Sequence, residues 1–186
     1  MSGIFGTSRL TTGRAGACKM LIAATPDNEA ARLAALYDLL LLDTPAEERF
    51  DRIVAFAATE FDVPIVTVTL VDTDRQWFKA RTGTELCETG RDISLCSHAI
   101  LEQDILVVND TLLDARFADN PLVTGAPHIR FYAGAPLTLP SSLSLGTLCL
   151  IDRKPRTLDA MELGILRTLR DLVVLELRNI SEVADA

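Results

Sequence analysis

The sequence has no uninterrupted apolar run close to the roughly 20 residues that a membrane-spanning helix needs, so no membrane span is expected. It also has no continuous apolar segment near its start, which argues against a cleaved secretory signal peptide. Apolar residues make up 48% of the 186 residues and charged residues 24%. This balance excludes a disordered tail, a collagen-like chain and a disulfide scaffold. The length predicts one globular domain with its own core.

Cysteine and histidine are scarce, and neither is clustered in the sequence. The two histidines, His98 and His128, are far apart, and the four cysteines show no C-x-x-C spacing, so a structural zinc site is not expected. Scattered thiols without a preceding secretory signal are typical of a reducing compartment, and we expect the protein in the cytoplasm. The cysteines are Cys18, Cys87, Cys96 and Cys149.

Basic residues are outnumbered, because 18 lysines and arginines stand against 26 aspartates and glutamates, for a net charge of −8. Residues 1–26 contain three of the basic residues and no acidic residue, so residues 27–186 are more acidic still. Nucleic-acid binding is mostly an electrostatic attraction of lysine and arginine to phosphates. We therefore expect no nucleic acid among the partners.

Residues 1–26 are rich in glycine, serine, threonine and alanine, and we expect a flexible extension there, before a domain at 27–180 and a short tail at 181–186. Leucines at steps of three and four after Asp27 or Asn28 predict a first helix. Thr44-Pro45-Ala46-Glu47 predicts the start of a second helix, with Thr44 as its N-cap. The first helix would present Leu33, Leu36, Leu39 and Leu40 on one face, and the second Phe50, Ile53, Val54, Ala57 and Phe61.

The middle of the chain has the composition of β-strands. Residues 65–71 are β-branched and apolar on both faces, as in a central strand, and a turn leads into an adjacent strand at 76–80. Further strands are predicted at 104–108, 131–139 and 145–151.

Two more helices complete the order of elements. Ser94 is expected to cap a short helix through Leu101, and Asp159 a final helix with Glu162 three residues on. The final helix is apolar on more than one side, which predicts a partner besides its own sheet. Hairpin-linked strands with terminal helices predict an α+β domain on an antiparallel sheet.

An ordered set of short segments runs through the chain, and the set resembles the GAF domain, a small-molecule sensory module of signalling proteins. The resemblance covers residues 27–179 and is greatest to the bacterial subgroup often fused to histidine kinases and diguanylate cyclases. The segments are Leu42-Asp43-Thr44-Pro45-Ala46-Glu47-Glu48-Arg49-Phe50-Asp51, Val71-Asp72, Arg75-Gln76-Trp77-Phe78-Lys79, Arg91-Asp92-Ile93-Ser94 with Cys96, His98-Ala99-Ile100, Arg116-Phe117, Asn120-Pro121-Leu122-Val123, Arg130-Phe131-Tyr132-Ala133-Gly134-Ala135-Pro136-Leu137 and Gly146-Thr147-Leu148-Cys149-Leu150-Ile151-Asp152.

The resemblance implies a central antiparallel sheet with the terminal helices on one face. On the other face, a short helix and the long loop at 109–130 would roof a ligand pocket, and a loop of that length is itself a sign of function. Because no output module follows Ile180, the expectation is a stand-alone sensor that binds a small molecule and acts on a kinase or cyclase in trans. The family pairs its terminal helices across a two-fold axis, so the leucine-rich final helix predicts a homodimer.

Candidate pocket residues follow from family position and from helix or strand geometry. Ser94 and His98 would share a helix face and could hydrogen-bond a polar ligand, or His98 could merely satisfy local backbone groups. Trp77 and Phe78 alternate across a strand, so one can face the pocket. Arg130 could bind a ligand carboxylate or phosphate, or brace the loop through a nearby aspartate. The candidates are Trp77, Ser94, Cys96, His98, Asp110, Phe117, Asn120, Arg130 and Tyr132.

An enzyme is the rival interpretation. Free methionine-R-sulfoxide reductases, one GAF branch, use cysteines beside this pocket, and Cys87 and Cys96 lie near two of their positions. That branch also needs a cysteine in the roofing loop, and residues 109–130 contain none, so a resolving thiol is missing. Cys149 lies in the middle of a strand and is expected in the core. We therefore expect no catalytic residues.

The sequence contains no motif for the known cofactors of this family, so the cofactor stays unknown. Covalent bilin binding uses a Cys-His pair before the strand that begins at Phe131, where this chain has His128 and no thiol. The Asn-Lys-x-Asp signature of cyclic-nucleotide binding is absent. Haem ligation by His98 or His128 has no supporting motif.

Overall fold

The computed structural model describes the backbone of residues 20–184 and the side chains of residues 20–180. Residues 1–19 of the predicted extension and 185–186 of the predicted tail lie outside the described residues. The helices are α1 (Glu29–Asp38), α2 (Glu48–Glu60), α3 (Leu95–Ala99), α4 (Pro121–Thr124) and α5 (Ala160–Ala184), with 3₁₀ turns η1 (Arg91–Ile93) and η2 (Thr111–Leu113). The strands are β1 (Ile65–Val71), β2 (Arg75–Thr82), β3 (Glu88–Gly90), β4 (Leu106–Val108), β5 (Phe131–Thr138) and β6 (Ser144–Asp152).

The strands form one six-stranded sheet in the order β3-β2-β1-β6-β5-β4, with every neighbouring pair antiparallel. β1 and β6 are the central strands, as the apolar sequence of β1 predicts, and all seven residues of β1 are buried. The short strand β3, which pairs with β2, has no counterpart in the sequence-based prediction. The α+β class on an antiparallel sheet is confirmed.

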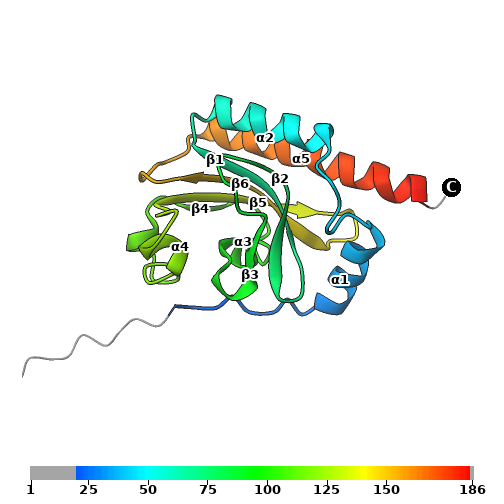
Figure 1. The fold of residues 1–186 in the computed structure, drawn as a ribbon, viewed down its shortest axis with the longest axis horizontal. Coiled ribbons are helices and arrows are strands. Elements are labelled where there is room, and N and C mark those ends of the chain that lie inside the picture. The colour runs from blue at the N-terminus through cyan, green and yellow to red at the C-terminus, as the bar shows by residue number, and fades with distance from the viewer. Residues whose placement is uncertain (1–19, 185–186) are drawn as a thin grey trace, which may run out of the picture.

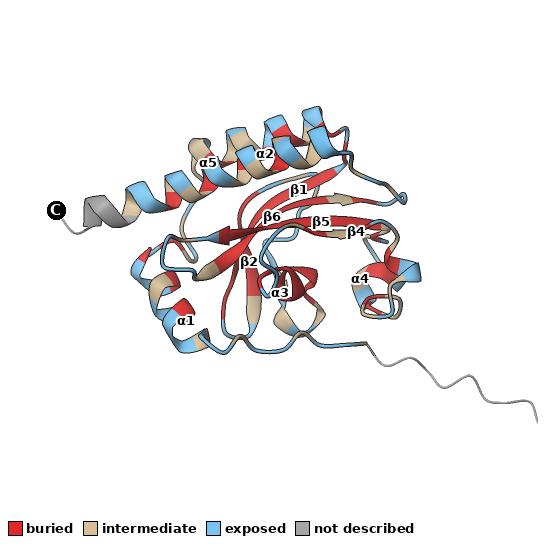
Figure 2. Cartoon of the chain, turned by 180° about the vertical axis from the view of Figure 1, so that it is seen from behind, coloured by how far each residue is buried: buried red, intermediate tan, exposed pale blue. Residues whose placement is uncertain are grey.

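Helices lie on both sides of the sheet. α2 and α5 run side by side across one face, and α3 and α4 lie against the other (Figure 1). α1 does not join α2 and α5, although the first helix was expected with them. It sits beside one end of the sheet, as the view from behind also shows (Figure 2). Among the described residues, no helix is long and apolar enough to cross a membrane.

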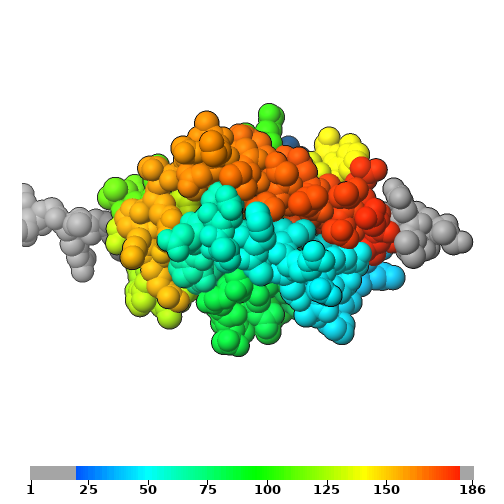
Figure 3. Space-filling view, turned by 90° about the horizontal axis from the view of Figure 1, so that it is seen from above, coloured from blue at the N-terminus to red at the C-terminus, as the bar shows by residue number. Residues whose placement is uncertain are grey.

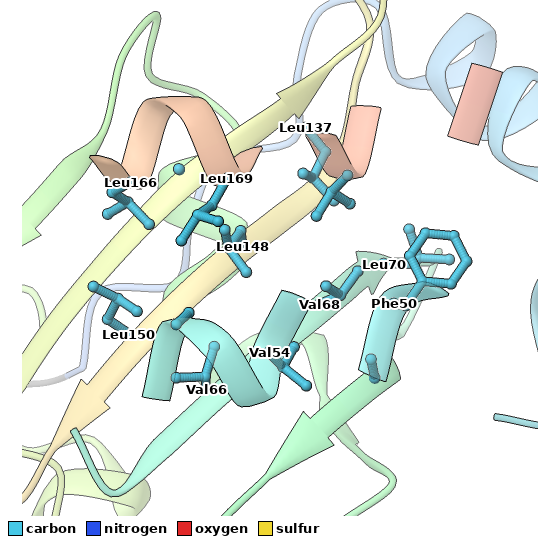
Figure 4. Packing of buried hydrophobic residues seen from close by; sticks show 14 of the residues in the cluster. Phe50, Val54, Val66, Val68, Leu70, Leu137, Leu148, Leu150, Leu166 and Leu169 are labelled. Carbon is cyan, nitrogen blue, oxygen red and sulfur yellow. The ribbon is translucent and has the colours of Figure 1, made fainter. Parts of the chain in front are cut away.

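The strand pleat divides the buried side chains into two cores. Val66, Val68 and Leu70 of β1 point toward α2 and α5, where they pack with Phe50 and Leu166 (Figure 4). The residues between them point to the opposite face, because side chains alternate along a strand. That second face carries a smaller cluster that includes Leu95, Cys96, Phe117, Tyr132 and Cys149. The second cluster lies where the resemblance places a ligand pocket.

The first two helices differ from their predicted ends. α1 ends at Asp38, and Leu40, whose φ is 51°, is 77% exposed rather than on the buried face. α2 begins only at Glu48, so Thr44 is not its N-cap. The Thr44 hydroxyl instead donates to the Leu41 carbonyl and accepts a 2.7 Å hydrogen bond from Lys79 Nζ. Thr44 and Pro45, which resemble a helix start in the sequence, therefore serve as hydrogen-bond acceptors for the buried Lys79.

Two predicted helix caps are confirmed. The backbone N–H of Ser97 donates to Ser94 Oγ at 3.1 Å, although α3 ends at Ala99 rather than at Leu101. Asp159 and Glu162 form a reciprocal capping box, with hydrogen bonds of 2.8 and 2.7 Å between each backbone N–H and the other side chain. α5 then continues to Ala184, past the expected domain end at residue 180.

Candidate functional site

A cavity of about 40 Å³ lies between the second face of the sheet and the segments that cover it. β1, β2, β5 and β6 form its floor, and α3, α4, the loop that follows α4, β3 and the β2–β3 loop cover it. Among residues 20–180, no side chain that lines the cavity is charged. The lining residues are Ile65, Thr67, Gln76, Phe78, Thr84, Leu86, Thr89, Leu95, Cys96, Leu122, Pro127, Ile129, Tyr132 and Ile151.

The polar side chains around this cavity are already hydrogen-bonded to one another. Gln76 donates through Nε2 to Thr89 Oγ1 at 2.5 Å, and its Oε1 accepts from the Ser94 hydroxyl at 2.6 Å. Thr67 and Thr69 share a 2.8 Å hydrogen bond between their hydroxyl oxygens. These groups are therefore satisfied without a ligand, although the cavity is partly open to solvent beside Leu86, which is exposed.

Two thiols lie close together beside the cavity, Cys96 in its lining and Cys149 behind it. Cys96 Sγ lies 3.4 Å from Cys149 Sγ, and both residues are buried. Cys149 Sγ also lies 2.9 Å from the Thr147 hydroxyl and 3.5 Å from that of Tyr132. Burial opposes ionisation of Cys96, but the hydrogen bond with Cys149, whose sulfur is in turn next to the Thr147 and Tyr132 hydroxyls, outweighs it and lowers the pKa of Cys96. Burial, together with the neighbouring Cys96 thiol, raises the pKa of Cys149.

Of the residues predicted from the sequence, Cys96 and Tyr132 line the cavity. Ser94 lies one hydrogen bond away, through Gln76. The remaining candidates have other partners, and the cavity lining does not include them.

Trp77 lies on the opposite face of the sheet from the cavity. Its ring packs in the core under α2, with Lys79 Nζ 5.9 Å from the ring centroid. Phe78 is the residue of this pair that lines the cavity. The alternation of β2 explains both positions, because Gln76 and Phe78 share one face while Trp77 and Lys79 share the other. Phe78, and not the predicted Trp77, is therefore the residue of the pair on the cavity side.

His98 and Phe117 form a contact of their own beside the cavity. His98 Nε2 is 3.0 Å from the backbone carbonyl oxygen of Leu21, and the His98 and Phe117 rings meet edge-on with centroids 4.9 Å apart. Burial lowers the pKa of His98 and so favours the neutral imidazole. This arrangement matches the alternative in which His98 satisfies a backbone group, here one from the N-terminal segment.

The other three candidates brace the long loop. Arg130 forms two hydrogen bonds with the Asp110 carboxylate, at 2.9 and 2.7 Å, and this pairing lowers the pKa of Asp110. Asn120 caps α4 by accepting from the Leu122 N–H, and its Nδ2 donates to the Ile93 carbonyl. Arg130 is thus engaged by the loop rather than aimed into the cavity.

The segments that carry the family resemblance also meet in space. Arg75 forms a bidentate ion pair with Asp43 at 2.9 and 2.7 Å, and Lys79 Nζ lies 2.6 Å from Glu47 Oε1. These pairs tie the chain before α2 to strand β2. The two motifs are therefore adjacent for a structural reason, on the face away from the cavity.

The arrangement is that of a GAF domain, and the chain belongs to this family, whose sequence profile matches residues 45–177. A stretch of 131 residues is 47% identical to a cyclic di-GMP phosphodiesterase of Pseudomonas aeruginosa, covering 70% of this chain and 22% of that protein. The chain thus spans less than a quarter of the length of this relative.

Solved structures with the same fold come from proteins of different activity. The GAF domain of an Acinetobacter phosphoenolpyruvate-protein phosphotransferase aligns with a TM-score of 0.59 at 15% identity, over 84% of this chain and 98% of that chain. The free methionine-R-sulfoxide reductase of Neisseria meningitidis, solved with its substrate, aligns with a TM-score of 0.58 at 16% identity, over 88% of this chain and 98% of that chain. At such identities the similarity shows the fold alone.

Proposed function

We propose that this chain is a sensory GAF domain that binds a small uncharged molecule in the cavity under α3 and carries no catalytic residues. The observation that carries the proposal is the cavity lining, which contains apolar, hydroxyl, thiol and amide side chains but no charged one. Membership of a sensory domain family supports the same role.

The lining disfavours charged ligands. Burying a charge without a partner costs several kcal/mol or more. Arg130 and Asp110, the charged residues among the predicted ligand-binding candidates, are paired with each other. A cyclic dinucleotide or a zwitterionic amino acid would bring charges that this cavity does not neutralise. The expected ligand is therefore mostly apolar, with at most a few hydrogen-bonding groups facing Gln76 or the threonines.

Because the cavity is small, a ligand could enter only if the segments that cover it move. Ligand sites usually enclose roughly 300–1,000 Å³, far more than the about 40 Å³ found here. Part of the roof, namely Thr84, Leu86, Leu122 and Pro127, comes from loops and the short helix α4. A ligand that fits only an opened roof stabilises that state, which is how occupancy becomes a signal.

We place the output at α2 and α5. These helices lie together on the face opposite the cavity (Figure 3), and Phe56, Leu172 and Leu175 leave apolar surface exposed there. We propose that a second copy of the chain covers this face in a homodimer. The name of the Pseudomonas relative supports an output to cyclic di-GMP turnover, and the kinase or cyclase expected in trans stays a prediction.

The reductase alternative gains no support from the positions of its two cysteines. Cys87 is exposed, and its Sγ lies 3.8 Å from the Glu85 carbonyl oxygen. Cys96 is buried, and its thiol faces Cys149 rather than Cys87. We therefore keep the non-catalytic function as the proposal.

Filling the cavity should abolish ligand binding. Leu122→Trp would place an indole in the roof, so an uncharged metabolite that stabilises the native chain should no longer stabilise the variant. At about 100 times its dissociation constant such a ligand should stabilise by about 2.7 kcal/mol. Thermal denaturation against a panel of uncharged metabolites, with indole and short alcohols included, measures this effect.

Leu112→Trp is the matched control, since Leu112 is exposed in η2 and does not line the cavity. It should keep the stabilisation. A panel in which only charged compounds stabilise the chain, or in which Leu122→Trp responds like the native protein, would contradict the proposed ligand class.

Placing a charge on the helical face should separate the dimer. Leu172→Glu would bury a carboxylate at the interface in both subunits, and we expect the dissociation constant to rise at least about 30-fold, as for loss of about 2 kcal/mol at an interface hot spot. Light scattering across a dilution series measures it. Leu113→Glu, at a position 85% exposed in η2, should leave the dimer intact. A native chain that is monomeric at high concentration would refute the homodimer.

A further inference from the structure

The paired thiols of Cys96 and Cys149 are not used by the function proposed above. Cys96 comes from α3, in the roof, and Cys149 from β6, in the centre of the sheet. Their sulfur atoms are 3.4 Å apart, against about 2.0 Å in a disulfide, so bonding requires an approach of only about 1.4 Å. The two residues are far apart in sequence, and the fold alone brings them together.

The surroundings of the pair are polar in an otherwise apolar interior. Hydroxyl groups of Thr69, Thr147 and Tyr132 lie 3.9, 2.9 and 3.5 Å from Cys149 Sγ. Hydroxyl groups that donate to one of two sulfur atoms in contact help the pair to hold a single negative charge, and a thiolate is the form that reacts with oxidants.

Access to the two sulfur atoms is unequal. Cys96 lines the cavity, whereas Cys149 does not and has no exposed surface. A cavity of about 40 Å³ has room for a molecule the size of a few waters, since one water needs roughly 10–15 Å³. A small oxidant that enters the cavity would therefore meet Cys96 first, with Cys149 directly behind it.

We propose that Cys96 and Cys149 form a peroxide-reactive dithiol site that closes into an intramolecular disulfide. The Cys96 thiolate attacks one oxygen of hydrogen peroxide, the O–O bond breaks, and the leaving hydroxide takes up a proton to become water. Cys96 is then a sulfenic acid. The Cys149 sulfur attacks the Cys96 sulfur, the S–S bond forms, and the sulfenic hydroxyl leaves as water with the Cys149 proton. Overall two thiols lose two electrons and two protons, and one peroxide becomes two waters.

The disulfide would tie the cavity roof to its floor. Because α3 carries Cys96 and the central strand carries Cys149, the bond fixes α3 against the sheet. It would also draw Cys96 out of the cavity lining toward β6. The reaction does not require the ligand proposed above, so the two proposals can fail separately.

Mass spectrometry of peroxide-treated protein tests the site. The full chain carrying Cys18→Ser and Cys87→Ser retains only Cys96 and Cys149 as thiols. After reduction, treatment with equimolar hydrogen peroxide and unfolding in an alkylating reagent, we expect a monomer that lacks two hydrogen atoms and takes up no alkyl group. Its digest should contain the peptides of Cys96 and Cys149 linked together, and dithiothreitol should restore both alkylation sites.

Two further variants, each made in the chain that already carries Cys18→Ser and Cys87→Ser, distinguish sulfenic acid formation from disulfide formation. Cys149→Ser should stop the reaction at the sulfenic acid, which dimedone would label at Cys96, and Cys96→Ser should give neither label nor bridge. The change from thiol to hydroxyl is small, and circular dichroism verifies that each variant is folded. Full alkylation of both cysteines after peroxide, or dimedone labelling at Cys149 rather than Cys96, would overturn the proposal.

Discussion

Gly146→Ala is expected to destabilise the domain by about 3 kcal/mol or more, which is a large part of the 5–15 kcal/mol that holds a typical domain together. Gly146 lies in β6 and pairs with Leu70 of β1 in the centre of the sheet. A Cβ atom at this position would lie 1.9 Å from the backbone carbonyl oxygen of Thr69. The contact is with backbone, so no side chain can move aside, and the two central strands would have to separate.

Urea unfolding measures this effect as a lower transition midpoint, or as loss of soluble protein. Gly164→Ala is the matched control, because a Cβ on Gly164, which is exposed in α5, meets no atom within 4 Å. That substitution should stabilise the chain by about 0.5–1 kcal/mol through the helix propensity of alanine. Equal midpoints for the two variants would show that β1 and β6 are not packed as described.

Arg32→Met is expected to detach α1 from the sheet, at a cost of about 2–3 kcal/mol. Arg32 is 1% exposed, and its guanidinium donates twice to Glu29 and, at 2.6 Å, to the Val71 carbonyl. Methionine fills most of the volume but leaves the carbonyl without its donor. Glu29 keeps its 2.5 Å ion pair with Arg91, which places the loss at the lower end of the range for broken buried pairs. Thermal unfolding at neutral pH measures the loss.

The same network predicts a dependence on acid. Hydrogen bonds from Arg32, and next from Arg91, outweigh the effect of burial and lower the pKa of Glu29 to about 2, against 4.5 for an ordinary glutamate. A lowered pKa means that the stabilisation is complete above about pH 4.5 and is lost as the pH falls toward 2. In Arg32→Met, the loss of unfolding free energy between about pH 4.5 and pH 2 should be smaller than in the native chain. Arg167→Met, which breaks an exposed pair with Asp104, should leave both stability and its pH profile nearly unchanged.

The sequence predicts the elements of this fold well where local chemistry decides them. The apolar run of β1, the turn that follows it and the Asp159–Glu162 capping box are all found as expected. Thr44 shows the limit of such reasoning. Its neighbours have every sign of a helix start, but the buried Lys79 ammonium, 35 residues away, needs the Thr44 hydroxyl and the Pro45 carbonyl as acceptors. The contact with Lys79 therefore decides the role of Thr44. The sequence around Thr44 does not show that contact, so local reasoning could not predict it.

The candidate site could be predicted less well, for a physical reason. Polar and charged residues attract attention in a sequence, yet the polar candidates Asp110, Asn120 and Arg130 hold the loop together through their own hydrogen bonds. The residues that line the cavity are largely apolar and resemble ordinary core positions. Strand alternation was the one signal that could have found them. Applied to β2 with the second face in mind, it selects Gln76 and Phe78 rather than Trp77.

Native mass spectrometry of the purified chain, run beside a denatured sample, tests the central claim most directly. We expect a dimer that carries, or takes up from a panel of uncharged metabolites, a discrete non-covalent mass that disappears on denaturation. The Leu122→Trp protein should be a dimer without that mass. A chain that stays free of every uncharged compound, or whose bound mass is a charged species such as a cyclic dinucleotide, would contradict the account.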